Sequence, residues 1–286
     1  MRPSSNSDGA AWRWLLALLV GGNLALALGL AGAQSLGLLS WPPVARVDAR
    51  GWRQLLDTGE FWHALGYSVV LTVVTVLLAV GLALLLQRAL GTTLRHGLVA
   101  RILYLPLAVP GVAAALLAFI VLGDSGILSR FGHTLGWVAT PADFPPLLFE
   151  ASGRGIVLTH LVLVTPLFVL LFERLAQHLH LPALLEQARA LGASSWRAWR
   201  VVALPLLLRQ ALPVIAVYAL ALLGAYEIPL MIGGTRPPMV AVVIAQAVNG
   251  YDLATRPQGY AMACAYLALV MLAWGVVTLF SHPRSR

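Results

Sequence analysis

Lysine is absent from this sequence, and all nineteen residues of the lysine or arginine type are arginines. A phosphate-binding loop that ends in Gly-Lys-Ser/Thr needs its lysine for the nucleotide phosphates, so the chain carries no ATP site of that kind. Cysteine is almost absent as well, because Cys264 is the only one and lies in an apolar run. A disulfide within the chain and a multi-cysteine metal site are therefore excluded, and we expect no metal site here.

Charge is also scarce. Only 10% of the 286 residues are charged, whereas about 25% is usual in a soluble domain. Hydrophobic residues make up 59% of the chain, and the mean hydropathy is +0.84. This composition excludes an ordinary soluble enzyme and indicates a polytopic membrane protein. The net charge of +8 does not predict a nucleic-acid partner, because the arginines are scattered beside apolar runs.

Long apolar runs recur along the chain, and about twenty such residues suffice to cross a hydrocarbon core. They predict an all-α membrane protein, a polytopic bundle of six transmembrane helices that forms one domain over residues 1–286. The predicted spans are about 14–33, 66–87, 102–123, 155–172, 206–232 and 258–280.

The first run leaves two alternatives open. Ala31-Gly32-Ala33 has the small residues of a signal-peptidase site, so removal of residues 14–33 is one outcome. The run is longer than the apolar region of a usual signal peptide, which favours a retained first helix.

The arginines predict the orientation of the spans. If the N-terminus is inside, the inner segments hold twelve arginines against three acids, and the outer segments hold the other seven against eight. The inner arginines are Arg2, Arg13, Arg88, Arg95, Arg101, Arg174, Arg189, Arg197, Arg200, Arg209, Arg284 and Arg286. An excess of positive charge marks the cytoplasmic side, so we expect both termini in the cytoplasm.

One polar stretch between two spans, residues 182–205, has a defined internal design. Pro182 suits the first turn of a helix, where its missing N–H is not needed. Gly192 can adopt the left-handed conformation that ends a helix, and Ser194 can cap a second one. The stretch therefore predicts a helix–glycine–helix elbow at the membrane surface.

The same stretch resembles the cytoplasmic EAA loop of bacterial ABC-importer permeases. That pattern has a glutamate followed by two alanines, a glycine six residues after the glutamate, and a Leu-Pro pair that ends thirteen residues after the glycine. The matching residues are Glu186, Ala188, Gly192, Leu204 and Pro205. Gln187 replaces the first alanine, and because glutamine is a helix former we expect the elbow to persist. Without the resemblance, the stretch reads as a basic amphipathic connector lying on anionic lipid.

The resemblance implies a permease in the bacterial inner membrane, with the loop docked on a separate ATPase. Glu186, Ala188 and Gly192 would form the docking surface. ATP and Mg²⁺ would belong to the ATPase subunits, so this chain would be neither an enzyme nor a holder of a cofactor. Expected partners are ABC ATPase subunits, a second permease chain, the same or different, an extracytoplasmic solute-binding protein and membrane lipid, without nucleic acid.

The wider chain is similar to the branch of this superfamily that serves spermidine/putrescine, ferric iron, thiamine and sulfate-type uptake. The resemblance rests on residues 61–62, 105–110 and 224–229, and it does not choose a substrate. Glu227 is the one acidic residue inside a predicted span, and it either meets the solute at an outer gate or is an ordinary interfacial glutamate. Tyr226 lines the path or anchors the interface, and Pro110 marks a kink that serves the path or the packing.

A transporter that works alone, as a channel or an ion-coupled carrier, is the main alternative. Such carriers place ionisable residues at mid-membrane and have paired halves. This sequence has neither feature, and it offers no pairing of catalytic residues for an intramembrane enzyme. Both alternatives also leave the elbow unexplained.

Overall fold

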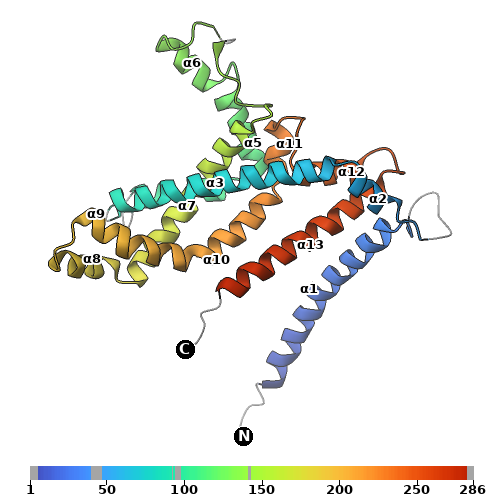
Figure 1. Cartoon of the computed structure of the whole chain (residues 1–286), viewed down its shortest axis with the longest axis horizontal. Helices are drawn as coiled ribbons and strands as arrows, with labels where there is room; N and C mark the ends of the chain where they lie inside the picture. Colours follow the sequence, from blue (N-terminus) through green and yellow to red (C-terminus); the bar gives the residue numbers. More distant parts are fainter. Residues whose placement is uncertain (1–5, 40–46, 92, 94–97, 141–142, 282–286) are drawn as a thin grey trace. The chain divides into compact units, whose positions relative to one another are not determined.

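The computed structural model describes residues 6–39, 47–91, 93, 98–140 and 143–281, and within these ranges the chain is helical without β-strands (Figure 1). Among the described residues, six helical segments are long and apolar enough to cross a membrane, which confirms the predicted all-α class. Arg2, Arg95, Arg284 and Arg286, which entered the charge count, lie outside the described residues.

The chain divides into two compact units. One comprises Met1–Trp62 with Val243–Leu272, and the other comprises His63–Val242 with Ala273–Arg286. The expectation that all 286 residues form one domain stays a prediction.

Four of the predicted spans lie whole within single helices. These helices are α1 (Asn6–Ser35), α3 (Glu60–Leu90), α7 (Arg154–His178) and α13 (Arg256–Ser281). Each helix extends past the predicted span at both ends, because flanking polar residues continue the helix beyond the apolar run.

The third span, predicted over about 102–123 with a kink at Pro110, is interrupted at its prolines. Helix α4 (Leu98–Ile102) ends early, a single 3-10 turn η2 (Pro106–Ala108) follows, and α5 (Gly111–Leu122) begins after the second proline. The residue before a proline is disfavoured in the helical conformation. Val109 is accordingly extended, with φ −82° and ψ 119°, and this interrupts the span before α5.

The fifth span, predicted over about 206–232, is also interrupted in the structure. Helix α10 (Leu204–Leu223) ends at Gly224, and a short helix α11 (Glu227–Ile232) starts three residues later. Pro229 has no N–H to continue the ladder, and its ring would clash with the carbonyl four residues earlier. In the first turn of α11 both defects are harmless, so the helix restarts there.

The segment predicted as a loop over 233–256 contains a helix, α12 (Val240–Asn249). The Gly and Pro pairs that precede it read as a loop, and ten residues are too few for a span. The backbone N–H of Val240, the first residue of α12, donates to Oγ of Ser68 on α3 at 2.8 Å. Ser68 is fully buried and donates its own proton to the Ala64 carbonyl, so one hydroxyl joins the two helices.

In the first unit, the short helix α2 (Arg50–Asp57) packs closely on the start of α13. A Cβ on Gly51 would lie 2.8 Å from the Pro257 backbone, so only glycine fits. The Trp52 indole N–H donates to Oγ of Ser35 at the end of α1, at 3.3 Å. These contacts hold the polar segment between α1 and α3 against the unit.

In the second unit, α7 is the most enclosed of the six long helices, with 61% of its most apolar window buried. Its C-terminal half packs in one cluster with α3 and α10, through the fully buried Val164, Phe168 and Phe172. Its N-terminal half packs in a second cluster with α5 and α11, through Ile156 and Val157. The helix therefore connects the two clusters.

Replacing Ser68 by alanine should destabilise this unit. The substitution removes the acceptor of the buried Val240 N–H, and an unsatisfied buried donor costs about 1–3 kcal/mol. We expect a lower unfolding midpoint in detergent, measured by thermal denaturation of the purified chain. Thr134→Ala is the matched control, because the Thr134 hydroxyl is exposed and bonds only within its own helix. Equal midpoints for the two variants would contradict the bridging role.

Candidate functional site

The elbow, residues 182–205, has the predicted helix–glycine–helix form. Helix α8 (Leu181–Ala190) is followed by Gly192 and by α9 (Ser195–Ala198). Gly192 has φ +91°, its N–H bonds to Arg189, and the next N–H, of Ala193, reaches back to Ala188 at 3.1 Å. This pair of bonds satisfies the last carbonyls of α8 in the usual glycine-terminated manner. Oγ of Ser194 accepts from the Arg197 N–H, as its position predicts.

The elbow continues without interruption into the fifth span. After α9, residues Trp199–Ala203 form η4, a π-helical turn, and α10 begins at Leu204 with Pro205 in its first turn. The Leu204 N–H bonds to the Trp199 carbonyl five residues earlier. The wider turn suits Pro205, which lacks an N–H and would collide with a carbonyl in a regular α-helix.

The predicted elbow residues separate into two groups. Glu186 and Gly192 are exposed, and Ala188 is half-buried beside them on α8. Leu204 and Pro205 lie beyond η4, at the start of α10. The first group can contact a partner, and the second connects the elbow to a span.

Glu186 does not pair with Arg189, the neighbour whose spacing favours a weak ion pair. The Nε of Arg189 donates to the Leu185 carbonyl at 3.2 Å instead. Among the described residues, the Glu186 carboxylate therefore has no cationic partner. It is available to an external group.

The side chain of Leu191 is 90% exposed at the turn of the elbow, although Leu191 continues the helical spacing of Leu184 and Ala188. An exposed leucine next to a left-handed glycine projects into solvent without support. Helical spacing could not reveal this, because Leu191 is where α8 stops being a helix.

Arg88 at the end of α3 contacts the part of the elbow after Gly192, α9 and η4, which we call its second arm. The sequence did not predict this contact. The indoles of Trp196 and Trp199 are stacked 5.6 Å apart with an interplanar angle of 14°. The guanidinium carbon of Arg88 lies 5.0 Å and 5.7 Å from the two ring centroids. Cation–π contacts of this kind tie α3 to the elbow.

Three predicted residues of the solute path meet where the third and fifth spans break. Helix α11, which begins at Glu227 next to Tyr226, packs against α5, which begins directly after Pro110. A Cβ on Gly111 would overlap the Oε2 of Glu227, so the carboxylate occupies the space that the glycine leaves. This place is the positive end of α5, which favours a negative charge. We call this contact between residues 110–111 and 226–227 the junction.

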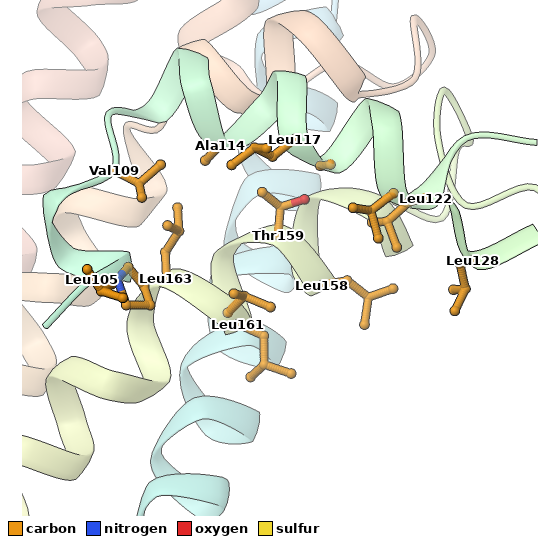
Figure 2. A pocket seen from close by; sticks show the side chains of 14 residues that line it. Leu105, Val109, Ala114, Leu117, Leu122, Leu128, Leu158, Thr159, Leu161 and Leu163 are labelled. Atoms are coloured by element: carbon orange, nitrogen blue, oxygen red, sulfur yellow. The ribbon is translucent and has the colours of Figure 1, made fainter. Parts of the chain in front are cut away.

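An apolar cavity of the second unit lies close to the junction. It has a volume of about 550 Å³ and is lined mainly by side chains of residues 105–109, α5 and α7, with Leu128 of α6 (Ile127–Thr134). Figure 2 shows leucines around it and one oxygen, the Thr159 hydroxyl, which already donates to the Gly155 carbonyl. No charged side chain of the described residues lines this cavity. It can accommodate apolar groups, but it offers no binding groups to a polar solute.

Within the described ranges, no group of three or more His, Cys, Asp or Glu side chains could hold a metal ion. His160, the buried histidine of α7, donates its Nδ1 proton to the Ile156 carbonyl of its own helix at 2.9 Å. It is a packing residue.

Residues 79–285 match the family described as the binding-protein-dependent transport system inner membrane component. The chain is 28% identical over 284 residues to the thiamine transport system permease protein ThiP of Brucella abortus (strain 2308), with 97% of this chain and 47% of that protein covered. It is 29% identical over 206 residues to ThiP of Escherichia coli (strain K12), with 70% and 36% covered. The chain thus spans about half or less of the length of these relatives.

A solved structure has the same fold. It is the crystal structure of a bacterial ABC transporter involved in the import of the acidic polysaccharide alginate, with a TM-score of 0.70 and 17% identity. The match covers 98% of this chain and 97% of the other.

Arg88→Ala should loosen the elbow. Loss of the cation–π contacts removes about 0.5–2 kcal/mol, so brief opening of the second arm becomes roughly fivefold more frequent. We expect trypsin to cleave after Arg197 and Arg200 correspondingly faster in the purified chain, followed by mass spectrometry of the fragments. Arg101→Ala is the control, because Arg101 is exposed and contacts no ring among the described residues. Unchanged cleavage in Arg88→Ala would show that Arg88 does not hold the elbow.

Proposed function

This chain belongs to the family of binding-protein-dependent transport system inner membrane components, and on that premise we propose that its elbow couples a solute path to a separate ATPase. The observation that carries the proposal is the elbow itself. Its tip, residues 186–192, is largely exposed, and its second arm continues directly into α10. A surface element that is joined to a span in this way can transmit force.

The tip offers a small docking surface. Leu191 supplies an exposed apolar anchor, Glu186 a carboxylate with no cationic partner in the described structure, and Ala188 a slim face between them. Interfaces draw most of their free energy from a few such central residues. The partner we propose is an ABC ATPase subunit, which would bring the ATP and Mg²⁺ that this chain has no lysine-containing loop to hold.

Movement of the docked elbow would reach the spans by two routes. One passes through η4 into α10, and the other passes from the two stacked indoles to Arg88 and α3. Trp199 and Ala203 are also buried in the same cluster as the C-terminal half of α7. Because this cluster is closely packed, the elbow would move with the helices and not independently of them.

We propose that the junction lies on the solute path. Breaks in spanning helices are tolerated where the backbone lines a cavity or is buried in protein, and both breaks of this chain meet at Glu227. A second permease chain would complete the path, and an extracytoplasmic binding protein would deliver the solute. The elbow and both termini would face the cytoplasm, in accord with the arginine bias.

The chemistry of the junction favours a cationic solute. Glu227 already occupies the anion-favouring end of α5, so a passing anion would meet a carboxylate and a cation would be attracted. Thiamine, the compound in the names of both ThiP relatives, is an organic cation and is the solute we propose to test first.

Gly192→Pro and Glu186→Lys should separate the chain from its ATPase while leaving it inserted. Proline cannot adopt φ +91° and lacks the N–H that bonds to Arg189, and lysine reverses the charge at the tip. We expect about tenfold less ATPase to co-purify with the tagged chain from its own membrane, quantified by mass spectrometry.

Gly192→Asn is the matched control for the proline variant, because asparagine tolerates positive φ, and Gln187→Lys is the control for charge. Both should retain the ATPase. If the unaltered chain purified alone in a detergent that preserves complexes, the docking proposal would be wrong and a self-contained carrier would replace it.

Glu227→Gln should reduce uptake of labelled thiamine by about fivefold in cells, because a partly exposed carboxylate contributes up to about 1 kcal/mol to binding a cation. Gly111→Ala should act in the same direction, since its methyl group displaces the carboxylate. Gly81→Ala is the control, because a Cβ there meets nothing within 4 Å. Uptake is compared at equal amounts of chain in the membrane. Normal thiamine uptake in Glu227→Gln would remove Glu227 from the solute path.

A further inference from the structure

A second cavity, of about 460 Å³, lies between the end of α3 and the elbow. Its lining includes Gln87 and Arg88 from α3, Arg189 from α8, and Ser195 and Trp199 from the second arm. The Arg88 contact explains how the elbow is held, but it does not explain why hydrogen-bond donors gather around an open space.

Both arginines keep free donors at this cavity. The Arg88 guanidinium packs over two indole rings, and it makes no hydrogen bond or ion pair with a described residue. Arg189 uses only its Nε, toward the Leu185 carbonyl. An arginine carries five N–H donors in a planar fork that matches the oxygens of a phosphate or carboxylate.

Two further polar side chains that line the cavity are largely buried. Gln87 is only 8% exposed, and its side-chain amide makes no hydrogen bond within the described structure. Trp199 is also 8% exposed, and its Nε1 has no acceptor among the same residues. Buried donors are normally satisfied, so the unpaired indole N–H of a residue that lines the cavity points to an acceptor that no described residue supplies.

The two arginines at the cavity favour an anionic acceptor. No acidic side chain is among the lining residues that the structure describes. Glu173, whose Oε2 would lie 3.8 Å from a Cβ on Gly91, is only 3% exposed, and its Oε1 accepts from Gln177. Two arginines without a facing acid leave a positive charge uncompensated at this place.

The opposite wall of the cavity is apolar, formed by Leu181, Pro182 and Leu185. An anionic phospholipid carries a phosphate next to apolar groups, and basic pockets between membrane helices bind such headgroups. We propose that this cavity binds a phosphate group, with donors from Gln87, Arg88, Arg189 and Trp199. The phosphate comes either from an anionic phospholipid or from free phosphate, and the proposal does not depend on docking of an ATPase.

Native mass spectrometry of the full chain in detergent tests the proposal. The probes are phosphatidylglycerol, phosphatidylcholine and inorganic phosphate, each added alone. We expect phosphatidylglycerol to remain bound in preference to phosphatidylcholine. Arg189→Gln should weaken that binding about tenfold, because it removes a charge-assisted contact. Gln87→Leu should weaken it by a smaller factor without any change of charge.

Arg197→Gln is the matched control, because Arg197 is an exposed arginine of the same elbow that does not line the cavity. Trypsin cleavage after Arg197 and Arg200, unchanged in Arg189→Gln and Gln87→Leu, would show that both variants keep the fold. Binding of inorganic phosphate that is lost in the same two variants would support the site and identify free phosphate as the source.

Equal phosphatidylglycerol binding by Arg189→Gln, Arg197→Gln and the unaltered chain would overturn the proposal. The proposal would also be overturned if none of the three probes bound and Arg189→Gln lost a co-purified ATPase. The arginines would then serve a protein partner. If the elbow bound no ATPase while the chain still bound lipid, the proposed function would be wrong and the phosphate site would stand.

Discussion

The packing of α7 is the constraint on which the second unit depends. One buried helix carries Phe168 and Phe172 into the cluster that includes the elbow and Ile156 into the cluster beside the junction. A closely packed helix transmits displacement along its length, because its neighbours leave few voids for it to move into. The elbow and the junction therefore share a rigid connection although they lie at different ends of the helix.

Proline and glycine residues determine where the spanning helices are interrupted. Pro110 and Pro229 each stand just after a break, and each is placed where a missing N–H does no harm. Gly111 then allows Glu227 to approach the start of α5. The two interruptions meet in space, so one small region combines a charge, an exposed aromatic residue and two helix starts within otherwise regular spans.

The elbow could be predicted closely because its determinants are local. Gly192 and Ser194 act on residues within four positions of themselves, and their spacing is visible in the sequence. The Arg88 contact with Trp196 and Trp199 joins residues more than a hundred positions apart, and no local pattern indicates it. Pro110 indicated the interruption of the third span, whereas the break after Leu223 was missed, since hydropathy counts apolar residues and does not register where a helix ends. Helix α12 was missed because the glycines and prolines before it conceal an apolar run that is too short to be a span.

The π-helical turn at Trp199–Ala203 fixes the rotational phase between the elbow and the fifth span. A regular α-helix advances about 100° per residue, and a π turn accommodates one additional residue within the same backbone. Relative to an unbroken α-helix from Ser195 to Leu223, the face that α9 presents is therefore turned by about 100° about the axis of α10. The direction in which the elbow tip faces thus depends on the number of residues before Pro205 as well as on their identity, and the length of this segment is under the same constraint as its sequence.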